Sequence, residues 1–432
     1  MPLMAISFMQ MAYSLIDLAW VGRLGSKSVA AVGAMGMLVW MMNSIACISK
    51  VGAEVSIGQS IGAKRFDKAA VCASHTTMIA LALGLFFGCL FFFAPQFFVA
   101  FFKLSPEISV KAVSFLRIIA IAIPFLFLNL NFAGIYIGTG RSDIPFYFSL
   151  VGLVINIILD PLLIFGLVPP FPALKTDGAA IATAFSMFVV SVLFLFHLKN
   201  KNRLMSRFPL FTRPRPDYVF KILKLGLPVA AMNVFFAIIN MNLVRIASIH
   251  GGHLGITSQT TGGQIEGITW NTSQGFATAL GSFVAQNYAA GNMQRAKTAY
   301  RYTLQIMGIL GAVVTAAFLL FGSSIFSIFI PEKAAYEAGG EYLFIIGISQ
   351  LFMMLELTTQ GMFNGIGRTT PPAVISMTLN FIRIPLAMFL ATKMGITGVW
   401  WAIAISTIIK GTVLPLWFLW MKFLLKKDCT DG

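Results

Sequence analysis

Asp17 has an ionisable carboxyl group but lies in an otherwise apolar segment, residues 2–21. An ionisable side chain at membrane depth is costly to keep, and such residues usually mark the path of an ion or a substrate. The segment ends in the run Asp17-Leu-Ala-Trp-Val-Gly-Arg-Leu-Gly25. Transport is therefore the first function that the sequence indicates.

The second half has its own charged residues at membrane depth, among them Glu266, Glu356 and Arg383. Glu266 and Arg383 are each 11 residues into their segments, and at the helical rise both fall near the middle of a membrane. An acid at this depth could attract a cationic substrate or bind a second ion. It could equally form a structural pair with Arg383. The sequence leaves both interpretations open for this candidate site.

The composition assigns the chain to the multi-span membrane proteins. Of its 432 residues, 58% are hydrophobic and only 11% are charged, and the mean hydropathy is +0.84. A span needs about 20 apolar residues to cross roughly 30 Å of hydrocarbon. We predict an all-α integral membrane protein with twelve spans: 2–21, 29–50, 70–100, 112–137, 145–168, 178–198, 224–247, 255–284, 299–330, 342–364, 372–392 and 397–421.

The positive charges are concentrated in alternate loops, which predicts the orientation of the chain. The formal net charge is +16, and most Lys and Arg residues follow the even-numbered spans or lie in the C-terminal tail. Positively charged loops remain in the cytoplasm, so both termini and the connection 199–223 are predicted to be cytoplasmic. Because topology accounts for the charge, nucleic acid is not an expected partner.

An internal repeat divides the chain into two halves. Two motifs recur at an offset of 227 residues and a third at 224. The matches are Gln59-Ser-Ile-Gly-Ala-Lys-Arg-Phe-Asp-Lys-Ala69 with Gln286-Asn-Tyr-Ala-Ala-Gly-Asn-Met-Gln-Arg-Ala296, Gly138-Thr-Gly-Arg141 with Gly365-Ile-Gly-Arg368, and Asn156-x4-Pro161 with Asn380-x4-Pro385.

The repeat predicts two six-helix lobes. An even number of spans per half returns the second half to the orientation of the first, so the lobes should be related by a pseudo-two-fold axis along the membrane normal. The substrate path is then expected between the lobes near the midplane. The predicted parts are an N-lobe at 1–198, a linker at 199–223, a C-lobe at 224–421 and a tail at 422–432. Two complete lobes suggest that a monomer suffices.

These motifs resemble those of the multidrug and toxic compound extrusion (MATE) transporters over essentially the whole chain. The resemblance implies twelve helices in two lobes of a bacterial cytoplasmic-membrane protein. It also implies export of cationic or amphipathic drugs and toxic compounds in exchange for protons or sodium. The motifs are Asp17…Val21-Gly-Arg-Leu-Gly25, Gln59-Ser-Ile-Gly-Ala63, its partner Gln286-Asn-Tyr-Ala-Ala-Gly291, and Gly140-Arg-Ser-Asp143 leading into Asn156-x3-Asp160-Pro161.

Within the family the sequence looks closest to the DNA-damage-inducible F type branch, whose ion-coupling site lies in the N-lobe. That branch has an Asp on helix 1, an Asn and an Asp on helix 5, and a Thr on helix 6. The matching positions here are Asp17, Asn156, Asp160 and Thr183. Other branches bind sodium with C-lobe carboxylates, but Glu356 does not register with them, so no role is transferred to it.

Helix geometry independently groups the N-lobe residues. Asp17 and Asp160 each lie 15 residues along helices predicted to start in the cytoplasm, roughly 22 Å from that side. Thr183 lies 5 residues from the outer end of its span, near the same level. Asn156 precedes Asp160 by one turn on the same face. The alternative is that the two acids merely hydrogen-bond neighbouring helices.

Two neighbouring carboxylates in a low dielectric cannot both stay ionised cheaply, so one is expected to hold a proton near neutral pH. The oxygens of Asp17, Asn156 and Asp160 would also suit sodium, a hard cation. The sequence leaves the choice between proton and sodium open. Apart from this coupling ion, no metal and no cofactor is expected.

Other classes of function lack the residues that they require. The chain has no Gly-x4-Gly-Lys-Ser/Thr pattern, so neither a nucleotide site nor an ATPase is expected, and an ion gradient must drive uphill transport. It has no His-Glu-x-x-His motif, so an enzyme is not expected. The remaining alternative is a lipid-linked oligosaccharide flippase of the same superfamily, for which Arg383 and Lys410 are the only hints.

Overall fold

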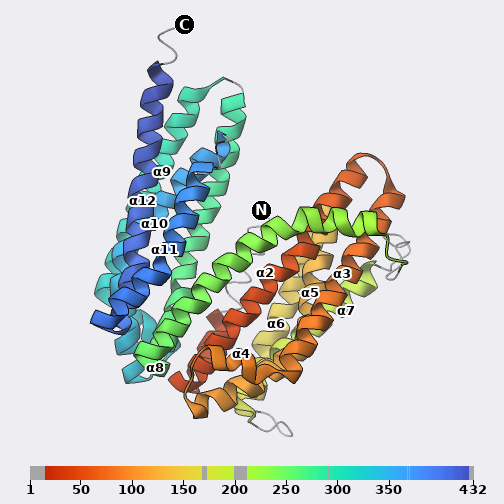
Figure 1. Ribbon diagram of the computed structural model, residues 1–432, viewed down its shortest axis with the longest axis vertical. Helices are drawn as coiled ribbons and strands as arrows, with labels where there is room; N and C mark the ends of the chain where they lie inside the picture. The colour runs from red at the N-terminus through yellow and green to blue at the C-terminus, as the bar shows by residue number, and fades with distance from the viewer. Residues whose placement is uncertain are drawn as a thin grey trace. The chain divides into compact units, whose positions relative to one another are not determined.

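The computed structural model describes residues 15–167, 173–198, 212–289, 291–366, 368 and 370–427. These residues fold as helices joined by short connections (Figure 1). A first helix is described from residue 15 to residue 22. The others are α2 (Ser26–Gly62), α3 (Phe66–Phe93), α4 (Pro95–Phe101), α5 (Pro106–Gly138), α6 (Asp143–Phe165), α7 (Lys175–Leu198), α8 (Pro216–Ala289), α9 (Met293–Phe329), α10 (Lys333–Gly365), α11 (Thr370–Met394) and α12 (Ile396–Lys427).

Ten of the described helices are long and apolar enough to cross a membrane. The longest, α8, is two helices joined at Gly252, whose φ of 56° and ψ of −146° are not helical. Glycine adopts a positive φ at little cost because it has no Cβ atom. Helix α8 therefore contains two of the predicted spans, and the first predicted span, 2–21, is described only from residue 15.

The predicted span 70–100 is wrong in length. Helix α3 ends at Phe93, and the short helix α4 starts at Pro95. Proline has no backbone N–H and fits the first turn of a helix but not its interior, so Pro95 separates the two. The same rule places the start of α8 at Pro216, inside the predicted linker; residues 199–211 of that linker lie outside the described residues.

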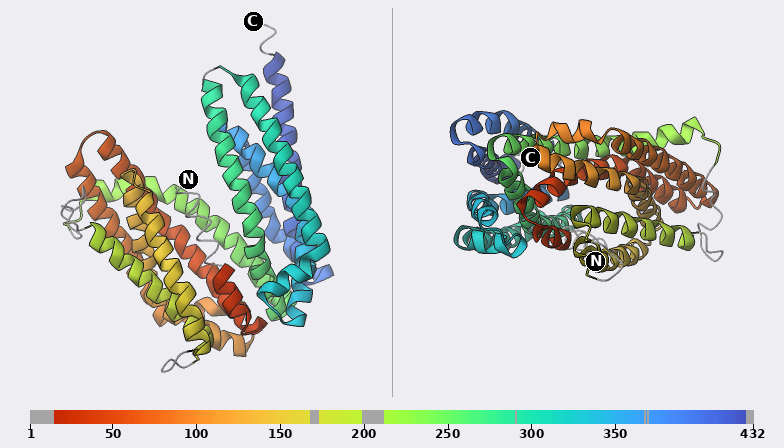
Figure 2. Two further views of the ribbon diagram at one scale, coloured as in Figure 1. Left: turned by 180° about the vertical axis from the view of Figure 1, so that it is seen from behind. Right: turned by 90° about the horizontal axis from the view of Figure 1, so that it is seen from below.

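The helices form two compact units that divide between Met241 and Asn242. In the first unit, α5 packs against α2, α3 and α7, and α6 packs against α7, as Figures 1 and 2 show from several sides. The start of α8 belongs to this unit. Gly226 lies against the backbone of Ile48, and the Arg215 backbone N–H donates a hydrogen bond to His75 Nε2 at 3.0 Å.

The second unit repeats the helix contacts of the first. Gly84 of α3 lies against Pro124 of α5, and Gly311 of α9 lies against Leu351 of α10, each 227 residues later. Glycine at these points lets helix backbones approach closely, as is common in membrane proteins. The same offset relates the contact of Gly134 with Lys50 to that of Gly361 with Ala277, and the contact of Gly138 with Glu54 to that of Gly365 with Gly281.

The repeat also fixes the register of α11 against that of α6. The turn before α6 closes with a hydrogen bond from Arg141 N to Tyr136 O, and the turn before α11 closes with one from Arg368 N to Phe363 O. Past the other ends of the two helices, Gly178 lies against Leu163 and Gly398 against Leu390. Leu390 follows Leu163 by 227 residues, so the sequence match of Asn156 with Asn380 at 224 is not the spatial one.

Candidate functional site

Helix α6 presents two polar side chains on its buried face. Asn156 and Asp160 are four residues apart, which places them one turn apart on the same side of the helix. Both side chains are 0% exposed, and Asn156 Nδ2 donates a hydrogen bond to Asp160 Oδ1 at 3.1 Å. One oxygen of the Asp160 carboxylate, Oδ1, therefore accepts a hydrogen bond from the amide, and the other, Oδ2, does not.

The first helix places Asp17 beside this carboxylate. Asp17 lies close enough to Asp160 for the two charges to interact. Trp20, almost one turn further along, makes an edge-to-face contact with Phe165 of α6, with ring centroids 6.1 Å apart. Asp17 lies beside Asp160 and, further along both helices, Trp20 lies beside Phe165, so the first helix runs parallel to α6 in this region. The two acids therefore lie at one level.

Helix α7 brings Thr183 to the same level. Gly178 of α7 lies against Leu163 of the preceding, antiparallel α6. Thr183 is five residues further along α7, so it lies opposite α6 within about one turn of Asp160. Its side chain is half-buried, and among the described residues its hydroxyl is not hydrogen-bonded to either acid. Thr183 thus lies at the level of the two acids, and its role as a ligand stays a prediction.

Three oxygens of this cluster are buried without a hydrogen-bond donor among the residues that the structure describes: Asp17 Oδ1, Asn156 Oδ1 and Asp160 Oδ2. In the same part of the chain, neither acid forms an ion pair with a basic side chain. A buried polar atom left without a partner costs about 1–3 kcal/mol. A proton or a small hard cation would satisfy these oxygens, so the site has the chemistry for either ion.

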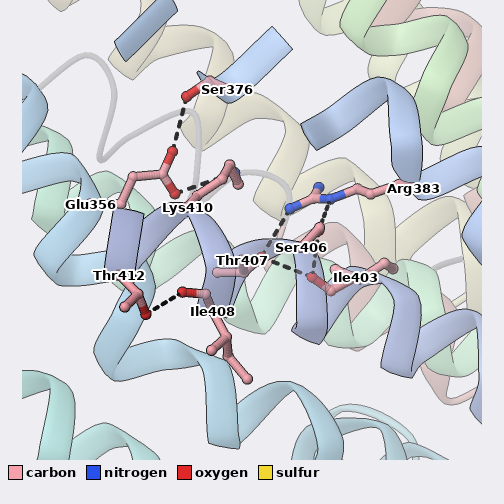
Figure 3. A network of polar contacts seen from close by, with 9 residues as sticks. All are labelled: Glu356, Ser376, Arg383, Ile403, Ser406, Thr407, Ile408, Lys410 and Thr412. Atoms are coloured by element: carbon pink, nitrogen blue, oxygen red, sulfur yellow. Dashed lines mark hydrogen bonds and ion pairs between the residues drawn. The ribbon is translucent and has the colours of Figure 1, made fainter. Parts of the chain in front are cut away.

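The second unit contains a charged cluster of both signs (Figure 3). Lys410 Nζ lies 3.2 Å from Glu356 Oε2, and Ser376 Oγ donates a hydrogen bond to Glu356 Oε1 at 3.0 Å. The side chains of Lys410 and Glu356 are only 9% and 5% exposed. Glu356 is therefore a buried acid whose two oxygens both have partners.

Arg383 forms hydrogen bonds with α12 and not with Glu266, the acid at the same predicted depth. Its Nε donates to Ser406 Oγ at 2.5 Å, and its Nη2 donates to Thr407 Oγ1 at 2.9 Å (Figure 3). Glu266 acts on Arg383 through its charge, and its carboxylate accepts a hydrogen bond from the Tyr342 hydroxyl at 3.4 Å. Within the described residues, Glu266 and Arg383 form no direct ion pair.

Corresponding positions of the two units carry different chemistry. At the offset of 227, the acids Asp17 and Asp160 correspond to Val244 and Ala387, which are buried and apolar. Asn156 corresponds to Arg383. Among the described residues, the second unit therefore has no acid at the positions that correspond to Asp17 and Asp160.

On the preceding helix of each unit, α5 and α10, the charge lies in the second unit instead of the first. Glu356 corresponds to Asn129, whose side-chain oxygen accepts a hydrogen bond from Ser191 Oγ at 2.7 Å. A neutral hydrogen bond thus stands where the second unit has its ion pair. Sequence reasoning missed the pairing of Glu356 with Lys410, although two buried charges of opposite sign each require a partner, and that requirement was the available signal.

The profile of the MatE family matches residues 2–162 and 228–389, which together make up most of the chain. The chain belongs to the MATE family of transporters. As a MATE protein it is a transporter rather than an enzyme, and the two matched stretches follow the same internal repeat as the helix contacts. The predicted family is confirmed.

Individual relatives agree with this assignment. The chain is 24% identical over 97% of its length to the probable multidrug resistance protein NorM of Thermotoga maritima, covering 90% of that protein. It is 28% identical over 92% of its length to the probable multidrug resistance protein YoeA of Bacillus subtilis, covering 87% of that protein.

A solved structure shows the same fold. It is described as the inward-facing conformation of a multidrug resistance MATE family transporter of the MOP superfamily. It matches with a TM-score of 0.88 at 24% identity, covering 97% of this chain and 96% of that one. The predicted all-helical membrane fold in two lobes is confirmed.

Proposed function

We propose that this MATE protein is a secondary antiporter that exports cationic or amphipathic compounds in exchange for protons or sodium ions. The three buried oxygens of Asp17, Asn156 and Asp160 that lack a donor carry the proposal, because a coupling ion would satisfy them. The relatives named as multidrug resistance proteins support compounds of this class as the substrates.

The acids would couple ion entry to a change in helix packing. Two ionised carboxylates at one level repel each other in a low dielectric. A proton on Asp160 Oδ2 removes one charge and supplies a donor to Asp17, which draws the first helix towards α6. Ion and substrate can drive alternating access only if each binds the two conformations with different affinity. A sodium ion would use the same three oxygens, with Thr183 as a candidate fourth ligand.

In this proposal the charged cluster of the second unit does not take up the coupling ion. Its two acids, Glu266 and Glu356, are balanced by Arg383 and Lys410. Glu266 lacks a direct ion pair among the described residues and is our candidate for contacting a cationic substrate. A coupling site confined to the first unit supports assignment to the DNA-damage-inducible F type branch.

The flippase alternative is not favoured. A pyrophosphate-linked substrate calls for several free basic groups, whereas Arg383 donates to Ser406 and Thr407, and Lys410 pairs with Glu356. The distribution of positive loops supports placement in a bacterial inner membrane with both termini in the cytoplasm. We further propose that the monomer is the working unit, because one chain supplies both halves of the repeat.

Efflux from proteoliposomes under separate proton and sodium gradients tests the proposal. Asp17→Asn and Asp160→Asn should each abolish uphill export while leaving downhill exchange of substrate intact. Asp143→Asn is the matched control, since Asp143 lies on the same helix but is exposed and paired with Arg141. The gradient that drives export identifies the ion. Full uphill export by both site variants would overturn the coupling assignment.

A further inference from the structure

The surface of the first unit has a groove between α3 and α5, with a volume of about 390 Å³. Its walls include Phe92, Val110, Ile118 and Ile121, and its one charged residue is Arg117. Val110 and Ile121 are 71% and 57% exposed. In a membrane-spanning helix, apolar side chains exposed to this degree face lipid, so a lipid molecule is the natural occupant of the groove.

Arg117 lies near one end of the apolar part of α3. Gly88 of α3 packs against Ala120 of the antiparallel α5, which places Phe92 at the level of Arg117. Helix α3 ends at Phe93, one residue later, whereas α5 continues to Pro106. An arginine here can lay its aliphatic stem along the apolar wall and extend its guanidinium to the lipid headgroups.

The guanidinium forms no ion pair among the described residues. Two acids lie near the groove, and both are engaged elsewhere: Asp177 Oδ2 accepts a hydrogen bond from Ser114 Oγ at 2.8 Å, and Glu107 is paired with Lys27 at 2.6 Å and with Lys111 at 3.7 Å. Guanidinium groups bind phosphate oxygens through paired, charge-assisted hydrogen bonds. The groove therefore joins an apolar channel to a free phosphate-binding group.

The second unit has a groove at the corresponding place with the opposite polarity. It lies between α9 and α10, has a volume of about 260 Å³, and includes Glu341 and Phe344. At the offset of 227, Phe344 corresponds to Arg117 and Glu341 to Ser114. The repeat has thus kept the groove but replaced the cation with an aromatic ring and added an acid.

We propose that the Arg117 groove binds one anionic phospholipid, with the headgroup phosphate on the guanidinium and an acyl chain along the wall formed by Phe92 and Ile121. The groove between α9 and α10 would repel the same lipid because Glu341 carries a negative charge. This site is separate from the coupling acids and does not depend on the proposed transport function.

Native mass spectrometry of the full chain with added phosphatidylglycerol or phosphatidylcholine tests the site. The wild type should retain one phosphatidylglycerol in preference to phosphatidylcholine. Arg117→Gln should bind it about five- to tenfold more weakly, the effect expected of one basic residue at an anionic membrane surface. Arg117→Lys should recover part of the loss. Glu341→Gln, the matched change in the other groove, should retain the first phosphatidylglycerol like the wild type.

A gain-of-function variant makes the test independent of folding defects. Glu341→Ser combined with Phe344→Arg copies the Arg117 groove into the second unit and should add a second bound phosphatidylglycerol. Free glycerol phosphate at the same concentration should not displace either lipid, because it lacks the acyl chain. Equal retention by the wild type and Arg117→Gln, or displacement by glycerol phosphate, would overturn the proposal.

Discussion

The first and second units bury charged groups by different means on the same framework. Beside α6 the first unit holds two acids with unsatisfied oxygens and no basic partner in the described part of the chain. The second unit pairs Glu356 with Lys410 and surrounds Arg383 with hydroxyl groups. The close glycine contacts repeat at one offset in both units. Packing therefore defines the shared scaffold, whereas uncompensated charge indicates where an ion can act.

The largest contrast should appear in ion coupling. Asp160→Asn is expected to reduce the substrate accumulation ratio to one, because an amide at this position can release no proton and carries no charge to bind sodium. Glu266→Gln is expected to keep uphill export, with a weaker apparent affinity for cationic compounds by about tenfold for one lost charge contact. Dye accumulation in proteoliposomes measures both. Loss of uphill export in Glu266→Gln would place coupling in both units and end the contrast.

Protein stability should depend more on the buried acid of the second unit, Glu356, than on that of the first, Asp160. Glu356→Gln leaves a buried lysine without its counter-charge and is expected to cost about 3–5 kcal/mol. Adding Lys410→Met should recover most of this loss, since an apolar replacement of a buried ion pair is often neutral. Asp160→Asn should change stability by no more than about 1 kcal/mol. Thermal unfolding in detergent tests the order, and equal losses from the two acid-to-amide changes would contradict it.

Packing should be equally sensitive in both units. A Cβ at Gly134 would collide with the backbone of Lys50, and one at Gly361 would collide with the backbone of Ala277. Gly134→Ala and Gly361→Ala should therefore each destabilise the protein by about 1–3 kcal/mol. Gly36→Ala is the control, because the space around Gly36 is open and alanine favours a helix. Unequal losses in thermal unfolding would show that the two frameworks differ.

The smallest effect concerns a surface ion pair that only the first unit has. Lys27 and Glu107 join α2 to α5, and their side chains are 50% and 57% exposed. The corresponding positions hold Leu254 and Ala334. Glu107→Gln should lower the unfolding temperature slightly at low salt and not at all at high salt, because salt screens exposed charges. A loss that persists in high salt would point to packing instead.

Helix geometry made much of this arrangement predictable from sequence. The fixed rise of a helix predicted one level for Asp17 and Asp160, and the spacing of four predicted the contact of Asn156 with Asp160. Lateral contacts between helices were not predictable in the same way. Lys410 is the partner of Glu356 because of the register between α10 and α12, which depends on the packing of the whole unit.

Two other differences have local causes. The sequence match of Asn156 with Asn380 followed neighbouring prolines, whereas the helix contacts at both ends of α11 place Arg383 at that position. The predicted span 70–100 ignored Pro95, where the chain ends one helix and starts another. Residue identity alone was sufficient for the second case but not for the first.

The hydrogen bond from Asn156 gives the Asp160 carboxyl group a single reactive side. A carboxyl group relays a proton most directly when one oxygen accepts it and the other releases it, but Asp160 Oδ1 already accepts the Asn156 amide. Proton uptake and release are therefore favoured at Oδ2. Such a carboxyl is better suited to holding a proton than to passing it along a chain, so proton leak through this residue should be slow while the conformation stays fixed.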